Sequence, residues 1–341
     1  MISDKIKGHE VKEFSLTPDF TGKTMNIEIV NSCNESCIYC YFSARGHHKM
    51  SGVIDEEFFY RITAEAKELG ITDIGLYITG EPFLNPKLSN YVYYLKKELQ
   101  FKYVYLSTNG ILCTPENLKK IADAGIDSIK FSVSSANREN FQKHHGVDAF
   151  ERVRENIEFA YNYRKENNLN YKLYMFSIIT RYNQQEKEEI QDLYGKYVDE
   201  IIFSNVISSP YVLGVEEYLK VIGDDSNMAI GGTTLPCTQL FDRIVVSAEG
   251  HLCVCCGETR TGYTWVEDLN KISLKEAVYG PKMQELRKMH IEKKIKGTIC
   301  ENCISGRNDN IIKPFMEGLT LPDKVDTVDI SDKIKERFIQ E

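Results

Sequence analysis

Three cysteines stand close together near the start of the chain. Cys33, Cys37 and Cys40 form a C-x3-C-x2-C motif that directly follows an apolar, strand-like stretch. Three thiolates can hold three irons of a cubane iron–sulfur cluster and leave the fourth iron open for another ligand. A structural zinc site is the alternative, and it would need a fourth ligand nearby, such as His47 or His48.

A second motif, Thr79-Gly80-Glu81-Pro82, closes the next predicted strand. The cysteine spacing, with Tyr39 just before the last cysteine, and this motif together resemble the radical SAM superfamily. The resemblance implies that the open iron binds S-adenosylmethionine (SAM) and that the reduced cluster cleaves SAM to a 5′-deoxyadenosyl radical. It also implies that the Thr79 to Glu81 loop contacts the methionine amino group. The family pattern is Gly-Gly-Glu-Pro, so Thr79 is a departure from it.

Further polar residues stand at the ends of later predicted strands. Ser107 and Asn109 end the third strand, and Ser132 and Ser134 end the fourth. The resemblance implies that these residues contact the cofactor, although relatives often carry Asp or Asn where Ser134 stands. Arg181 follows the fifth strand and could hold a carboxylate or phosphate, but it is a poor base because it stays charged.

A second group of cysteines follows in the last third of the chain. Cys237, Cys255 and the pair Cys300-x2-Cys303 resemble a twitch domain, the shortened form of the SPASM domain. The resemblance implies one auxiliary [4Fe-4S] cluster held by these four thiolates. A four-cysteine zinc site stays open as an alternative, because tetrahedral sulfur suits both metals.

Two more cysteines flank the second of these ligands. Because side chains alternate along a strand, Cys253 shares a face with Cys255 and Cys256 does not. The spacing from Gly250 is the one typical of these domains and favours Cys255 as the ligand. Cys253 and Cys256 are therefore candidate hydrogen-atom donors in a radical reaction.

The first two thirds of the chain alternate short β-branched runs with longer helical ones, which indicates repeated βα units and a parallel sheet. The fold class expected is α/β, a partial (β/α)6 radical SAM barrel with a small C-terminal twitch domain. Strands are predicted at 25–31, 74–78, 102–107, 128–133, 171–178 and 200–204, and helices at 55–69, 86–99, 115–124, 150–165 and 184–194.

Four regions are expected along the chain: the barrel at 1–205, a bridging region at 206–236, the twitch domain at 237–305 and a C-terminal tail at 306–341. Within the twitch domain a β-hairpin should turn at Glu249-Gly250. A helix over 273–293 should be interrupted at Gly280-Pro281 because proline cannot continue it.

Composition limits the function further. The 341 residues are 42% hydrophobic, carry a formal net charge of −8 and include ten cysteines. No apolar run reaches 18 residues and the start is unlike a signal peptide, so a cytoplasmic chain that does not bind a membrane is expected. In that compartment clustered cysteines indicate metal, and the negative charge disfavours nucleic acid as a partner.

Together these features predict an oxidoreductase. A substrate radical can lose its electron to a cluster with four protein ligands, and twitch enzymes similar to this chain oxidise a secondary alcohol of a sugar or cyclitol. The expected partners are such a small molecule and an electron donor such as flavodoxin or ferredoxin. A peptide maturase is the first alternative, disfavoured by the short stretch before the first strand. A radical epimerase and a non-enzymatic scaffold are the others.

Overall fold

A computed structural model of the protein describes residues 11, 13–40, 52–205, 235–257, 259, 262–305 and 315–319. The predicted bridging region lies outside the described residues apart from Leu235 and Pro236, and so does most of the predicted tail. None of the described helices is long and apolar enough to cross a membrane.

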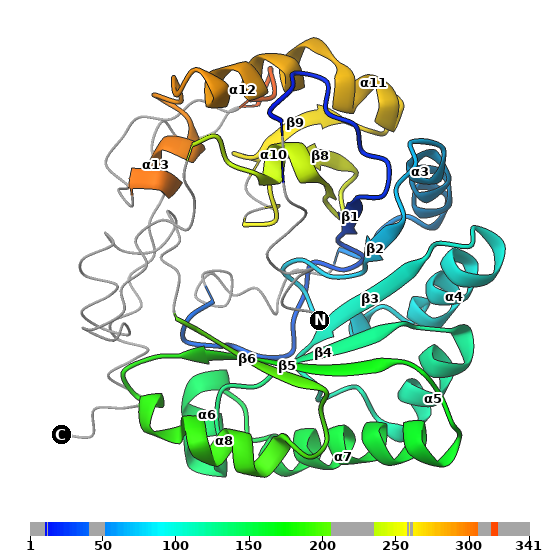
Figure 1. The fold of residues 1–341 in the computed structure, drawn as a ribbon, viewed down its shortest axis with the longest axis vertical. Helices are drawn as coiled ribbons and strands as arrows, with labels where there is room; N and C mark the ends of the chain where they lie inside the picture. Colours follow the sequence, from blue (N-terminus) through cyan, green and yellow to red (C-terminus); the bar gives the residue numbers. More distant parts are fainter. Residues whose placement is uncertain are drawn as a thin grey trace.

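The first half of the fold is a curved parallel sheet covered by helices on its outer face (Figure 1). This arrangement confirms the predicted α/β class. The strands are β1 (Thr24–Ile27), β2 (Asp73–Gly75), β3 (Tyr103–Thr108), β4 (Ser128–Ser132), β5 (Lys172–Ile179) and β6 (Glu200–Asn205). The α-helices between them are α3 (Glu56–Glu68), α4 (Leu88–Tyr93), α5 (Pro115–Ala124), α6 (Arg138–His145), α7 (Phe150–Glu166) and α8 (Lys187–Tyr194).

The cysteine-rich second half continues the same sheet. β7 (Arg243–Val246) pairs in parallel with β1, and β8 (His251–Cys253) and β9 (Trp265–Asp268) follow as antiparallel strands. The strand order is β6-β5-β4-β3-β2-β1-β7-β8-β9. The helices of this half are α10 (Gln239–Asp242), α11 (Leu274–Tyr279), α12 (Pro281–Ile291) and α13 (Ile299–Ser305). They lie at the top of Figure 1.

Local hydrogen bonds and residue types determine where these elements begin and end. The Asp55 carboxylate caps α3 by accepting from the Phe58 N–H, and Thr114 caps α5 ahead of Pro115. Gly125 ends α5 with a φ of +97°, a left-handed conformation that favours glycine. The hairpin turn at Gly250 and the break between α11 and α12 are confirmed as predicted.

Some elements differ from the sequence prediction. β1 ends at Ile27 rather than near residue 31, and the predicted helix over 86–99 is divided into α4 and a π-helical turn, η3 (Tyr94–Glu98). Helix α6 was not predicted, because its sequence offers only Phe141 as a large apolar residue. Its buried face is completed by His144 and His145, which sequence periodicity does not count as core residues.

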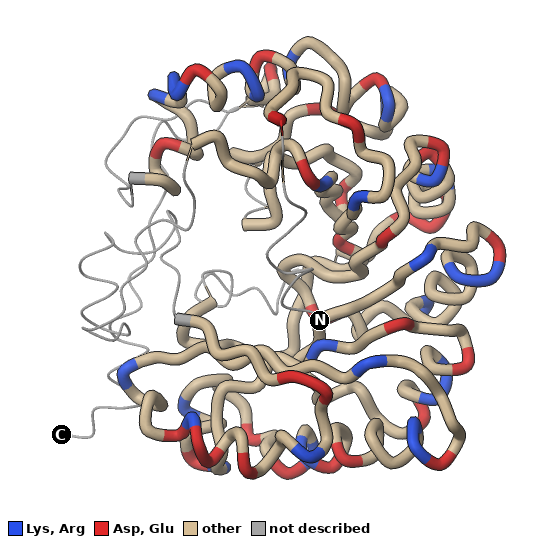
Figure 2. The backbone as a smooth tube through the Cα atoms, in the orientation of Figure 1, with Lys and Arg blue, Asp and Glu red and all other residues tan. Residues whose placement is uncertain are grey.

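Charged residues gather on the outer helices, while the strands inside carry few of them (Figure 2). Arg287 on α12 is an exception, because its side chain is fully buried. It donates to the backbone carbonyls of Leu16 at 2.9 Å, Leu240 at 3.1 Å and Val278 at 2.8 Å. Its guanidinium also lies over the ring of Phe20. One side chain thus ties the N-terminal segment to α10 and α11.

Arg287→Met should therefore destabilise the fold. Up to three buried carbonyls would lose their donor, so we expect the free energy of unfolding to fall by about 3 kcal/mol. Chemical denaturation followed by circular dichroism measures this change. Arg154→Met is the matched control, because Arg154 forms an exposed pair with Glu151, and it should cost under about 0.5 kcal/mol. Equal effects of the two substitutions would contradict this role of Arg287.

Candidate active site

A cavity of about 370 Å³ lies at the carboxyl ends of the parallel strands. Parallel-sheet enzymes place their chemistry at this end of the strands. Cys33, Cys37 and Cys40 line the cavity, as do the predicted cofactor contacts Tyr39, Thr79, Gly80, Glu81, Ser107, Asn109, Ser132 and Ser134. Arg181 is not among the lining residues.

The loop that carries the three cysteines is held by the end of helix α6. The Ser36 and Ile38 N–H groups donate to the carbonyls of His145 and His144, each at 2.9 Å. The last carbonyls of a helix have no partner within the helix, so they are available for such a loop. Helix α6 thereby fixes the backbone on both sides of Cys37.

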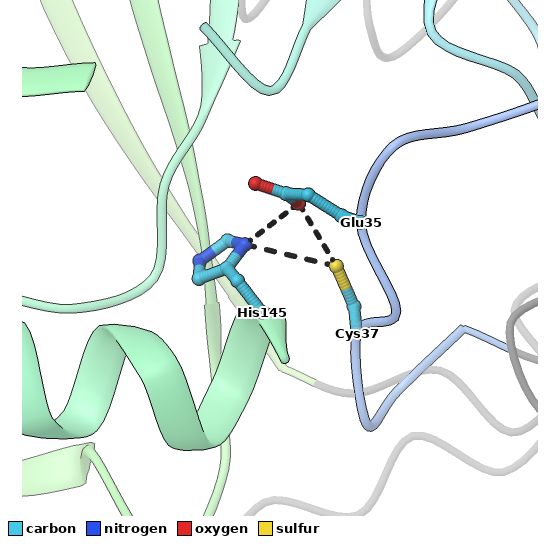
Figure 3. Close-up of side chains that lie close together, drawn as sticks. All are labelled: Glu35, Cys37 and His145. Carbon is cyan, nitrogen blue, oxygen red and sulfur yellow. Dashed lines mark hydrogen bonds and ion pairs between the residues drawn. The ribbon is translucent and has the colours of Figure 1, made fainter. Parts of the chain in front are cut away.

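Glu35 and His145 support Cys37 through their side chains (Figure 3). The Glu35 carboxylate lies 3.1 Å from the Cys37 sulfur and 2.9 Å from Nδ1 of His145. The Ser134 N–H donates to Nε2 of His145 at 3.2 Å, so the ring proton is on Nδ1 and points at Glu35. Such groups around a ligand fix its orientation.

Gly80 brings the second motif against the cysteine loop. A Cβ at Gly80 would lie 2.1 Å from the Val30 carbonyl oxygen and 2.8 Å from that of Ser32, so only glycine fits. The next residue, Glu81, donates its N–H to the Ser32 carbonyl at 2.8 Å. The predicted cofactor loop and the residue before Cys33 are therefore bonded directly.

The Glu81 carboxylate is buried and locked in place. It accepts from the Thr108 hydroxyl at 2.7 Å, from the Asn109 N–H at 2.8 Å and from the Phe83 N–H at 3.2 Å. Burial raises the pKa of Glu81 to about 7, although these hydrogen bonds oppose the shift. Its role is to hold the ends of β2 and β3 together, with Asn109 turned toward Cys33.

Thr79, the departure from the family motif, has a specific partner. Its hydroxyl and its N–H both donate to the carboxylate of Glu28 at the end of β1, the N–H at 3.2 Å. The other oxygen of Glu28 accepts from the Thr259 hydroxyl at 3.1 Å and from the Ala248 N–H at 3.5 Å. The buried Glu28 thus joins the cofactor loop to the cysteine-rich half of the chain.

Hydroxyl groups line another part of the cavity wall. The Ser134 hydroxyl accepts from the Ile178 N–H at 3.0 Å and lies 3.2 Å from the Tyr39 hydroxyl. Ser107 and Ser132 face each other across β3 and β4, with their hydroxyls 3.2 Å apart. These groups can exchange hydrogen bonds with a ribose or with a substrate hydroxyl.

The four predicted auxiliary ligands lie near one another. Cys300 and Cys303 act electrostatically on Cys255, and Cys237 acts electrostatically on Cys300 and on Cys303. Burial raises the pKa of Cys255 and that of Cys303, the latter to about 11, so metal binding would have to displace the thiol protons.

The two flanking cysteines have different surroundings. Cys253 is buried in β8, and its thiol donates to the His251 carbonyl at 3.6 Å. Cys256 lines the same cavity as the first cysteine loop, and its thiol donates to the Gln239 side chain at 3.5 Å. Of the two candidate hydrogen-atom donors, only Cys256 faces the site.

Sequence reasoning missed several residues of the site. Glu28 and Glu35 are acidic side chains at buried positions, and an acidic residue beside a predicted metal ligand is a signal that could have been noticed. Lys130 is a third such residue, because it is the one charged residue in the strand Ser128–Ser132. Its surroundings could not have been known before the strand order.

The chain matches two protein-family models. Residues 27–194 match the radical SAM superfamily, and residues 237–304 match SPASM, an iron–sulfur cluster-binding domain. The first region runs from the last residue of β1 to the end of α8, and the second contains β7, β8 and β9. The family implies SAM and a [4Fe-4S] cluster as cofactors.

Solved structures of radical SAM proteins share the fold. BtrN in complex with AdoMet and 2-DOIA aligns with a TM-score of 0.52 over 88% of this chain and 98% of that one, at 14% identity. Streptococcus suis SuiB bound to precursor peptide SuiA aligns with a TM-score of 0.61 over 80% and 68%, also at 14% identity. For anSMEcpe with bound AdoMet the TM-score is 0.57 over 93% and 96%, again at 14% identity. At this identity the likeness concerns the fold alone.

Curated relatives are similar over part of their length. An uncharacterized protein of Methanocaldococcus jannaschii is 31% identical over 202 residues, which cover 59% of this chain and 63% of that protein. A probable GTP 3′,8-cyclase of Saccharolobus islandicus is 34% identical over 136 residues, 40% of this chain and 42% of the cyclase. The chain thus spans less than two thirds of either relative.

The cysteine loop, the Gly80 approach and the second cysteine group agree with both family matches. The chain belongs to the radical SAM superfamily and carries a C-terminal SPASM domain.

Proposed function

We propose that this protein is a radical SAM oxidoreductase that oxidises a secondary alcohol of a sugar- or cyclitol-like small molecule to a ketone. The observation that carries the proposal is the group formed by Cys237, Cys255, Cys300 and Cys303, in which Cys255 directly precedes the cavity-lining Cys256. Four thiolates would occupy every iron of one auxiliary [4Fe-4S] cluster. Such a cluster has no open iron for a substrate, but it can accept the electron that a substrate radical must lose.

The residues of the cavity fit the proposed cofactors. Cys33, Cys37 and Cys40 would hold the SAM-binding [4Fe-4S] cluster, and the loop around Gly80 would contact the methionine group of SAM. When bound, these cofactors supply a 5′-deoxyadenosyl radical, and the auxiliary cluster supplies an acceptor for one electron. An external donor such as flavodoxin or ferredoxin would reduce the clusters in the cytoplasm.

The hydroxyl-lined wall supports a polar substrate. The Ser107, Ser132 and Ser134 hydroxyls face a cavity whose charged carboxylates are already engaged in hydrogen bonds. The BtrN structure holds 2-DOIA and the SuiB structure holds a peptide, so peptide modification is the alternative that a product analysis must separate. The domain limits would be 1–205 for the barrel, 206–236 for the bridging region, 237–305 for the cluster domain and 306–341 for the tail.

The position of Cys256 favours a second candidate, a radical epimerase. A thiol that lines the cavity could return a hydrogen atom to the opposite face of a substrate carbon. Cys253 is unsuited to this role because it is buried in β8. The two candidates differ in electron count, since epimerisation leaves the oxidation state of the substrate unchanged.

The metal content is the first test. Anaerobically reconstituted protein should hold about 8 Fe and no stoichiometric zinc, as expected for two cubanes with cysteine ligands. Joint replacement of Cys33, Cys37 and Cys40 by Ala should leave about 4 Fe and abolish SAM cleavage. Elemental analysis and a 5′-deoxyadenosine assay measure both. One equivalent of zinc with about 4 Fe in the parent would contradict the auxiliary cluster.

A series of single substitutions tests the ligand set. Cys255→Ala should lose the auxiliary cluster, because this thiol lies among the other predicted ligands. Cys256→Ala should keep the iron content of the parent, and so should Cys253→Ala, the buried control on the adjacent strand. Iron analysis and visible absorbance compare the three variants. Loss of iron from Cys256→Ala would reassign the ligand.

The product distinguishes the candidate reactions. A dehydrogenase consumes one SAM per product, and the product is lighter by two hydrogens and contains a new carbonyl. Deuterium at the attacked carbon should appear in 5′-deoxyadenosine, which mass spectrometry detects. 2-DOIA and inositol are the first compounds to assay. In deuterated water a product that gains one deuterium and loses no hydrogens would instead support the epimerase, and Cys256→Ala should then abolish that incorporation.

A further inference from the structure

Lys130 lies just beneath the cavity on the inner face of the sheet. It stands on β4 two residues before Ser132, which lines the cavity, so the two side chains share a face. The Lys130 ammonium lies 5.0 Å from the centre of the Tyr77 ring and 4.9 Å from that of the Phe176 ring. Both rings line the cavity.

No ion pair among the described residues includes Lys130. The faces of the Tyr77 and Phe176 rings lie against its ammonium group. A cation over two rings gains some electrostatic stabilisation, but much less than from a paired carboxylate in the same surroundings. Burial lowers the pKa of Lys130 to about 8, and Cys256 opposes the shift.

The other titratable groups around Lys130 in the described residues are poor proton acceptors, because they already hold their protons. Just after β2, burial raises the pKa of Tyr77 to about 12, and on β3 burial raises the pKa of Tyr105 well above its usual value, so both stay protonated. On β5, Tyr174 pairs with Lys130 in register, and burial raises its pKa too. On β7, Arg243 forms an ion pair with Asp242.

We propose that Lys130 is the proton acceptor of the reaction, and that its uncharged Nζ takes the hydroxyl proton of a polyhydroxylated substrate bound in the cavity. This inference rests on the proposed oxidation and identifies the base that the oxidation requires. The O–H bond of the substrate breaks and an N–H bond to Lys130 forms. The alcohol also loses a hydrogen atom from carbon to the 5′-deoxyadenosyl radical and one electron to an iron–sulfur cluster, which balances a two-electron oxidation to the ketone.

The neighbouring candidates are less suitable. The Arg181 guanidinium is a poor proton acceptor. The Glu81 carboxylate already accepts three hydrogen bonds that hold the strand ends in place. Lys130 can lose its proton near neutral pH, because burial disfavours its charged form.

The first experiment needs no substrate. The reconstituted holoenzyme is labelled with trace acetic anhydride at a series of pH values, and mass spectrometry follows the peptide that contains Lys130. Its labelling should be half-maximal near pH 8, as for a lysine with a pKa of about 8. The exposed Lys275 is the internal control for the labelling of an accessible amine. Equal midpoints, or no labelling of Lys130 in the native protein, would overturn the proposal.

The second experiment uses any compound that the product assay identifies as a substrate. Lys130→Met should still transfer substrate deuterium to 5′-deoxyadenosine, because hydrogen abstraction does not need the base. Ketone formed per 5′-deoxyadenosine should fall about 100-fold. In the parent enzyme kcat should rise with pH through about 8, because the uncharged amine is the active form. This pH dependence should be absent from Lys130→Met.

The Lys130→Arg variant tests whether Lys130 acts as a base or only as a fixed positive charge. An arginine keeps the charge but cannot take up a proton, so this variant should be as impaired as Lys130→Met. Full activity of Lys130→Arg would overturn the proposal and leave Lys130 as an anchor for an anionic group. Lys120→Met, on the outer face of α5, is the matched control and should behave as the parent. If no compound is oxidised, the proposed function fails, whereas the labelling result decides independently whether Lys130 can be uncharged.

Discussion

The parallel pairing of β1 with β7 is the constraint on which the rest of the structure depends. Because the two strands run in the same direction, β7 ends on the same side of the sheet as the carboxyl ends of the barrel strands. The loop after β8 returns to that side and places Cys256 and Gly257 in the wall of the cavity. Glu28 completes the junction by holding Thr79, Thr259 and the β7–β8 turn with one carboxylate.

This junction relates the two groups of cysteines to one another. The first group follows β1 directly, and the second is attached to the strand that pairs with β1. Cys33, Cys37 and Cys40 of the first group line the same cavity as Cys256, which follows the predicted ligand Cys255. In the proposed oxidation, a substrate in this cavity would lose a hydrogen atom and then an electron.

Most polar groups of the cavity are positioned by other groups rather than free to react. Glu81 holds the ends of β2 and β3, and Glu35 is held by His145 beside Cys37. Such satisfied networks are rigid, because each buried polar group would otherwise lose its hydrogen bonds without compensation. Lys130 and Cys256 stand apart from these networks, and they are the residues on which the two candidate reactions depend.

The sequence by itself determined the family, the α/β class and most helix boundaries, because these depend on local spacing. The C-x3-C-x2-C motif, the cap at Asp55 and the glycine after α5 each act within a few residues. Only the tertiary structure decided that β7 joins β1, that helix α6 holds the cysteine loop and that Cys256 rather than Cys253 faces the cavity. These features depend on contacts between segments far apart in the chain, such as Glu28 with Thr259, which no local pattern encodes.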